Sequence, residues 1–255
     1  MSINPVAFTI GQFAVYWYGI LIASAVLIGT VLALREVERR GYNQDHYFNI
    51  IMVALPAAFI GARLYYVLFN WDYYSLNLKE IPATWQGGLA IHGGLIAALL
   101  AAYLMMRKYR IRFFQGVDIA APGIVLGQAI GRWGNYFNQE AYGYTVDPEK
   151  VPWAMYIDGA YRHPTFLYEF LWNVGIFIFL LWLRRKENLK EGDIFLSYAL
   201  LYSIGRFIIE SFRTDSLMLF STLRAAQVVS AAAIIVSAVF LYLNHKKKRT
   251  SEAEG

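Results

Sequence analysis

Residues 13–34 read FAVYWYGILIASAVLIGTVLAL, an apolar run without a charged side chain. A helix that crosses a bilayer needs about 20 mostly apolar residues, so this run is long enough to span a membrane. A cleavable signal peptide would have a basic segment before a shorter apolar run, and residues 1–12 contain no Lys or Arg. The sequence therefore predicts a first membrane-spanning helix that is retained.

The composition of the whole chain agrees with a membrane protein. Of its 255 residues, 58% are hydrophobic and only 16% are charged, with a mean hydropathy of +0.38. Soluble domains have about 25% charged residues, and disordered chains combine low hydrophobicity with high charge, so both classes are excluded. The chain has no cysteine, which excludes disulfides, thiolate nucleophiles and zinc–thiolate sites.

Seven windows are apolar enough to be spans, which predicts an all-α polytopic membrane protein with seven transmembrane helices. They are residues 13–34, 47–69, 88–106, 116–135, 165–183, 194–212 and 223–243. One membrane domain is expected over residues 1–245, followed by a charged cytoplasmic tail at 246–255. The segments 70–87 and 136–164 are expected on the outward side and are long enough to fold. Both are rich in aromatic residues, which suit the headgroup layer.

The basic residues predict the orientation of these spans. Fifteen lie in alternate connecting segments and in the tail: Arg35, Arg39, Arg40, Arg107, Lys108, Arg110, Arg112, Arg184, Arg185, Lys186, Lys190, Lys246, Lys247, Lys248 and Arg249. The intervening segments hold only Lys79, Lys150, Arg162 and Arg213. Because cytoplasmic loops are enriched in Lys and Arg, the N-terminus is expected outside and the tail inside. The net charge of +5 is therefore a topological feature, and no nucleic-acid partner is expected.

Polar residues gather at the outward end of the fourth window. Arg132 and Asn135 are three residues apart and share a helix face, and Asn138 and Glu140 follow directly. Ionisable groups within spans are costly and are usually functional or tightly paired. Glycines recur at every fourth position before them: Gly123, Gly127 and Gly131. This ridge predicts close packing against a neighbouring helix.

The sixth window carries a polar stripe made by Tyr202, Arg206 and Glu210 at four-residue spacing. One interpretation is an Arg206–Glu210 pair that neutralises itself. The other is a cationic wall in which the carboxylate holds an arginine that binds phosphate, because the planar guanidinium donates two parallel hydrogen bonds and stays protonated. The spacing leaves both interpretations open.

His92 stands between apolar residues and Gly93-Gly94 at the start of the third window. The glycines allow a ligand to approach the backbone, and a neutral imidazole can act as a general base near neutral pH. A lone histidine can equally be a hydrogen-bonded structural residue. The remaining histidines are scattered, so no metal site and no cofactor are predicted.

These residues match a known pattern, Gly131-Arg132-x-Gly-Asn135-x-x-Asn138-x-Glu140-x-x-Gly143. The chain resembles the bacterial phosphatidylglycerol–prolipoprotein diacylglyceryl transferases. The supporting blocks are Trp17-Tyr18-Gly19, His92-Gly93-Gly94, Arg162-His163-Pro164-Thr165-x-Leu167-Tyr168-Glu169 and Gly205-Arg206-Phe207-x-x-Glu210-x-x-Arg213. Tyr136 departs from the usual Phe, and the segment between the fourth and fifth windows is shorter than in some members.

The resemblance implies transfer of the sn-1,2-diacylglyceryl group from phosphatidylglycerol to the lipobox cysteine thiol of a prolipoprotein signal peptide. A thioether forms and glycerol phosphate leaves. The expected place is the outer face of the bacterial cytoplasmic membrane, within the lipid bilayer. The resemblance assigns catalytic roles to His92, Arg132 and Arg206, with Arg132 on the lipid phosphate. The other substrate-binding residues that it implies are Tyr18, Asn135, Asn138, Glu140, Gly143, Tyr202 and Glu210.

Two points stay open at this level. His92 is the candidate base for the thiol, because arginine has a pKa above about 12 and does not readily lose its proton. The same arginines could also serve a transporter or flippase for an anionic solute or lipid. Such proteins often contain inverted repeats and broken helices, and the sequence displays neither.

Overall fold

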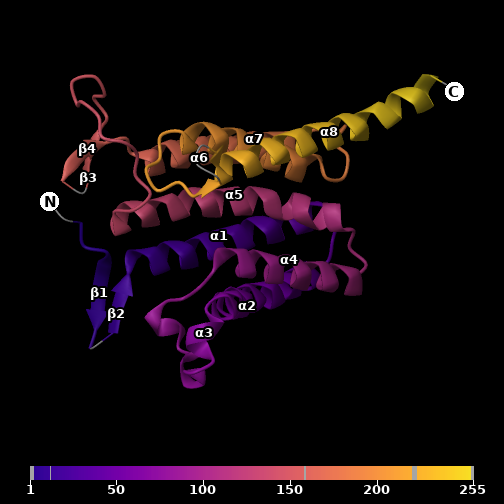
Figure 1. The fold of residues 1–255 in the computed structure, drawn as a ribbon. Coiled ribbons are helices and arrows are strands. Elements are labelled where there is room, and N and C mark those ends of the chain that lie inside the picture. The colour runs from indigo at the N-terminus through magenta and orange to yellow at the C-terminus, as the bar shows by residue number, and fades with distance from the viewer. Residues whose placement is uncertain (1–2, 12, 158, 220–222, 254–255) are drawn as a thin grey trace. The chain divides into compact units, whose positions relative to one another are not determined.

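The computed structural model describes residues 3–11, 13–157, 159–219 and 223–253, and most of them are helical (Figure 1). Seven long helices fall on the seven apolar windows. They are α1 (Trp17–Arg39), α2 (Gln44–Phe69), α4 (Ile91–Lys108), α5 (Phe113–Asn138), α6 (Thr165–Leu183), α7 (Asp193–Glu210) and α8 (Ala225–Ala253). The helix α8 thus continues into the expected tail, whose last two residues lie outside the described part of the chain.

Five of these helices, α1, α2, α5, α6 and α8, are long and apolar enough to cross a membrane. The protein is therefore a multi-pass membrane protein. The helices α4 and α7 have 18 residues each, and α7 carries Asp193, Arg206 and Glu210. Length and composition alone do not place these two with the other five.

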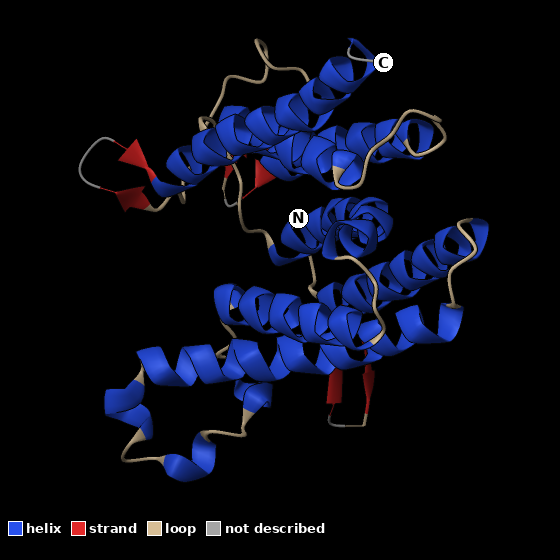
Figure 2. Cartoon of the chain, turned by 90° about the vertical axis from the view of Figure 1, so that its right-hand side faces the viewer, coloured by secondary structure: helices blue, strands red, loops and turns tan. Residues whose placement is uncertain are grey.

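The prediction of an all-α fold agrees with a mostly helical structure, and three small antiparallel hairpins occur beside the helices in the described residues (Figure 2). They pair β1 (Val6–Ile10) with β2 (Phe13–Tyr16), β3 (Met155–Ile157) with β4 (Ala160–Arg162), and β5 (Met218–Leu219) with β6 (Leu223–Arg224). The first window therefore becomes helical only at Trp17. Three of its first four residues, Phe13, Val15 and Tyr16, are good strand formers, and this segment pairs with β1 after the turn at Gly11.

The chain divides into two compact units, residues 34–116 and residues 1–33 with 117–255. In the first unit α2 packs along α4. A Cβ at Gly61 would lie 2.7 Å from the Gly93 carbonyl oxygen and would also meet the Ala97 side chain. Glycine is therefore needed at Gly61 and Gly93 because the two helix backbones approach each other closely.

The segment between α2 and α4 is short helical turns: α3 (Trp71–Tyr74), η1 (Leu78–Glu80) and η2 (Thr84–Gln86). Arg63 of α2 is buried beneath it and donates hydrogen bonds to the backbone carbonyls of Glu80, Ile81, Gly87 and Gly88. The arginine in the second window is therefore a support for the expected outward segment 70–87.

In the second unit α6, α7 and α8 lie side by side, and α5 contributes to the same core (Figure 1). The core consists of Ala121, Val125, Ile176, Leu180 and Ile194. The glycine ridge of α5 packs against α1 as expected. A Cβ at Gly123 would lie 3.1 Å from the Gly29 carbonyl oxygen, so even a methyl group would force a small shift of the α1 backbone.

Candidate functional site

The polar residues at the end of α5 form one hydrogen-bonded group in the structure. Arg132 donates from Nη1 to the Asn135 side-chain oxygen at 3.1 Å. The Asn135 and Asn138 amides both donate to Glu140 Oε1, at 3.0 and 3.3 Å. Because α5 extends to Asn138, three residues beyond the predicted window, Arg132 and both asparagines are on the helix itself.

The backbone after α5 has an unusual conformation that brings Glu140 back towards the helix. Gln139 and Ala141 have φ values of 52° and 57°, in the left-handed region that residues other than glycine seldom adopt. The Glu140 amide bonds to the Asn135 carbonyl at 3.0 Å. Such backbone strain persists only where surrounding contacts impose it, and it is frequent at functional sites.

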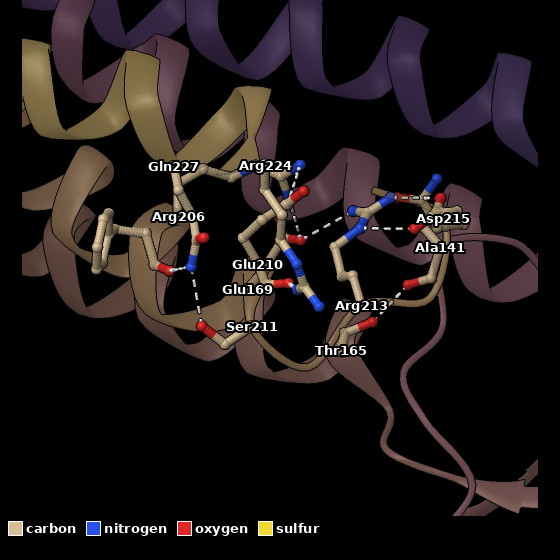
Figure 3. A network of polar contacts seen from close by, with 12 residues as sticks. Ala141, Thr165, Glu169, Arg206, Glu210, Ser211, Arg213, Asp215, Arg224 and Gln227 are labelled. Carbon is tan, nitrogen blue, oxygen red and sulfur yellow. Dashed lines mark hydrogen bonds and ion pairs between the residues drawn. The ribbon is translucent and has the colours of Figure 1, made fainter. Parts of the chain in front are cut away.

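The end of α7 supplies the second group of charges (Figure 3). Arg206 forms an ion pair with Glu210 through Nη2 at 2.7 Å, as the four-residue spacing predicts. Arg213, three residues after the helix, forms a two-pronged contact with Asp215 at 2.9 and 2.7 Å. Glu210 is 1% exposed, so its charge is compensated inside the protein.

Glu169 of α6 connects these two groups. Its Oε2 lies 3.1 Å from Arg132 Nε, and its Oε1 lies 3.0 Å from Arg206 Nη1 and 3.2 Å from Arg213 Nη1. The carboxylate thus joins α5, α6, α7 and the segment after α7. Glu169 ends one of the motifs that support the family resemblance, but no role was predicted for it. Its presence in the apolar window 165–183 was the feature that could have revealed it.

Burial and charge act together on the ion pair that follows α7. Burial raises the pKa of the Asp215 carboxyl, but hydrogen bonds from Arg213 and its positive charge outweigh this and lower that pKa below its usual range. For Arg213, burial lowers the pKa, and the contacts with Asp215 and Glu169 raise it above the ordinary value. Both groups therefore remain charged at neutral pH.

Tyr18 and Gly143 also border the polar groups of this unit. The Tyr18 ring lies against Gly134 of α5, where a Cβ would overlap it. Gly143 bridges to Arg213 in the backbone, and its amide donates to the His163 carbonyl at 2.9 Å. A Cβ at Gly143 would lie 2.7 Å from the His163 side chain, so no larger residue fits.

Two of the expected site residues have different surroundings. Tyr202 lies one turn before Arg206, where its ring packs near Tyr198 and against the apolar core. His92 belongs to the unit of residues 34–116, at the exposed start of α4 and 6.3 Å from the Tyr65 ring. The neighbouring Gly93 meets Tyr65 and Gly61, so the close approach that this glycine permits is to α2.

The charges in this cluster do not balance. Arg224, at the end of β6, adds a further guanidinium, which donates to the Glu210 carbonyl and, at 2.8 Å, to the Tyr144 hydroxyl. We define the arginine cluster as Arg132, Arg206, Arg213 and Arg224 with Glu169, Glu210 and Asp215. Four guanidinium groups face three carboxylates, which leaves one positive charge. Glu140 is solvent-exposed and is linked to Arg132 through the Asn135 amide, so the site has no net charge when this carboxylate is counted.

An apolar cleft of about 570 Å³ lies between α6 and α7 in the same unit. Its lining includes Tyr168 and Phe212, which directly neighbour Glu169 and Arg213 in the sequence, together with Trp172 and Ile208. The fold and this site define a multi-pass membrane protein with a cationic site beside an apolar cleft. That combination suits a ligand that has an anionic head and an apolar body.

Comparison with known proteins identifies the family. The sequence model described as prolipoprotein diacylglyceryl transferase matches residues 5–243. A relative from Geobacillus kaustophilus (strain HTA426) is 51% identical over 96% of this chain and 93% of its own length. Relatives from Bacillus velezensis (strain DSM 23117 / BGSC 10A6 / LMG 26770 / FZB42) and Bacillus mycoides (strain KBAB4) are each 48% identical over 96% of this chain and 93% of their own length. All three are named phosphatidylglycerol–prolipoprotein diacylglyceryl transferase.

The chain belongs to the prolipoprotein diacylglyceryl transferase family and is an enzyme of that family. The resemblance found in the sequence motifs is thereby confirmed.

Proposed function

We propose that this chain transfers the diacylglyceryl group of phosphatidylglycerol to the cysteine thiol of a prolipoprotein lipobox. The observation that carries the proposal is the arginine cluster, in which the buried Glu169 holds both Arg132 and Arg206 while these two guanidinium groups remain partly exposed, in a chain of this family. The names of its relatives supply the two substrates.

In the proposed reaction the cysteine sulfur attacks the glycerol carbon that carries the phosphate oxygen. The carbon–oxygen bond breaks, a carbon–sulfur bond forms, and glycerol phosphate leaves with the electron pair. A cysteine thiol has a pKa of about 8.5, so a base must take its proton before or during the attack. Fixed guanidinium donors stabilise the charge that develops on the leaving phosphate, and they act most strongly where water is excluded.

The roles proposed for individual residues rest partly on the contacts and partly on the family resemblance. Arg132 and Arg206 bind the phosphate, since both are partly exposed, at 21% and 22%, and can still reach a ligand. Asn135 and Glu210 hold these two guanidinium groups from the side. Asn138, Glu140, Gly143, Tyr18 and Tyr202 shape the surroundings of the substrates, and His92 receives the thiol proton.

We further propose seven spans, with the N-terminus outside and the end of α8 in the cytoplasm. A helix of 18 residues is about 27 Å long, close to the thickness of the hydrocarbon core, so α4 and α7 are long enough to cross it. The alternation of basic segments supports this orientation in the bacterial cytoplasmic membrane. In this proposed orientation the arginine cluster lies towards the outer face of the membrane.

The test is mass spectrometry of a lipobox peptide incubated with the purified protein and phosphatidylglycerol in detergent. We expect a diacylglyceryl mass gain on the peptide cysteine, and its loss in Arg132→Ala together with weaker binding of phosphatidylglycerol. An unmodified peptide from a folded protein that still binds the lipid would favour a transporter or flippase. Unchanged lipid affinity in Arg132→Ala would contradict the phosphate role.

A further inference from the structure

Glu169 is a buried carboxylate in an otherwise apolar helix. It lies in the second turn of α6 and is 4% exposed. A buried charge is tolerated only where partners compensate the loss of hydration, and replacing such groups by apolar residues often stabilises a protein. A contribution to stability therefore does not by itself explain why a glutamate occupies this position, and its ion-pair partners suggest another role.

Two of the three arginine partners of Glu169 are those proposed to bind phosphate, and each of the two is held at a second point. Arg132 contacts Glu169 through Nε and Asn135 through Nη1. Arg206 contacts Glu169 through Nη1 and Glu210 through Nη2. Two anchors on a planar group fix its orientation as well as its position. Arg213 also forms an ion pair with Glu169 Oε1 and a second one with Asp215 (Figure 3).

The anchoring leaves part of the donor capacity of Arg132 unused. Its Nε lies 3.1 Å from Glu169 Oε2, but the N–H is not aligned with that oxygen, so the contact is an ion pair without a hydrogen bond. Among the described residues, this buried Nε finds no other acceptor. This Nε is enclosed by protein, so an incoming phosphate oxygen meets the partly exposed remainder of a guanidinium that Glu169 and Asn135 already orient.

We propose that Glu169 is a positioning residue for diacylglyceryl transfer, which orients Arg132 and Arg206 towards the phosphate of the lipid. The inference rests on the function proposed above and adds a residue to it. Glu169 acts through the two arginines and does not itself contact the substrate. Its negative charge repels the anionic lipid, so Glu169 contributes by orienting the two arginines and not by attracting the substrate.

The test is Glu169→Gln, which keeps the size of the side chain and removes its charge. We expect kcat, normalised to the number of phosphatidylglycerol-binding sites, to fall roughly 10- to 100-fold, because small misplacements of catalytic groups cost this much. The KM for phosphatidylglycerol should not rise, since a repelling charge has been removed. Glu169→Asp, which retains the charge, should recover part of the rate.

A matched control is Asp193→Asn at the start of α7. Asp193 is also a buried carboxylate, 2% exposed, and its ion-pair partner is His245 at 2.9 Å. We expect this variant to lose thermal stability and to keep the normalised rate. A normalised rate of Glu169→Gln within threefold of the wild type, or a raised KM with unchanged kcat, would overturn the positioning role. Because the wild type is assayed in parallel, failure of its own transfer would instead count against the proposed function.

Discussion

The contacts of Arg63 allow a quantitative prediction for the segment that leads to His92. Replacing Arg63 with Met keeps an unbranched apolar stem and removes every N–H donor. Five hydrogen bonds are lost, to the carbonyls of Glu80 and Ile81 at 2.7 Å each, of Gly87 at 2.8 Å, of Gly88 at 2.9 Å and of Ala83 at 3.5 Å.

The loss of free energy depends on how deeply the Arg63 side chain and the carbonyl groups that it bonds to are buried. A net contribution of about 0.5–1.5 kcal/mol for each hydrogen bond gives about 3 kcal/mol in total, at the lower end because water can reach the half-exposed carbonyls. Since 1.36 kcal/mol is a factor of ten, local opening of residues 76–90 becomes roughly 100-fold more frequent. His92 follows four residues after Gly88, so transfer should weaken as well.

The assay is hydrogen exchange followed by mass spectrometry on the protein in detergent. Peptides covering residues 76–90 should exchange up to about 100-fold faster in Arg63→Met, while those from α8 keep their rates. Arg107→Met is the matched control, because Arg107 is exposed at the end of α4 and does not support this segment. Exchange of residues 76–90 within threefold of the wild type would refute the reasoning.

Three further predictions concern packing, pH and catalysis. Gly123→Ala should lower the thermal unfolding midpoint, because the added Cβ would lie 3.1 Å from a carbonyl oxygen of α1. Gly127→Ala should not lower it, because there the added Cβ would lie 3.8 Å from its nearest neighbour. The pKa of Asp215 is lowered in the folded protein, so its pair with Arg213 should stabilise the protein at pH values above 3.8, the ordinary pKa of aspartate. This stabilisation should be lost as the pH falls through the lower pKa of the folded state. Unfolding midpoints of Asp215→Asn between about pH 3 and 7 measure this, and an identical pH dependence in variant and wild type would contradict it. His92→Gln should bind phosphatidylglycerol and fail to modify a lipobox peptide, and full activity would exclude the base role.

The helices were predictable because hydropathy is a local property. Each apolar window contains the information for its own helix, since a helix satisfies its backbone within one segment. The hairpins were not predictable in the same way. Phe13–Tyr16 is as apolar as the helix that follows, and only its pairing with Val6–Ile10 across the turn at Gly11 distinguishes the two.

The same division applies to the candidate site. The contacts among Arg132, Asn135, Asn138 and Glu140 involve neighbours in the sequence, so their spacing predicted that they would meet. The contacts of Glu169 join residues that are 37 and 44 positions apart. No periodicity within one helix could indicate them, because they depend on which helices become neighbours.

Charge balance could nevertheless have pointed to Glu169. A carboxylate in an apolar helix requires a cation, and the arginines at the helix ends were the available partners. The same balance bears on the two interpretations of Arg206 and Glu210. A self-neutralised pair would need no other ion, but Arg206 also contacts Glu169, which is shared with Arg132 and Arg213. The ion pair is present, and it is part of a larger network that joins α5, α6 and α7. This network excludes an isolated, self-neutralised pair and leaves Arg132 and Arg206 partly exposed, which supports the proposed phosphate site.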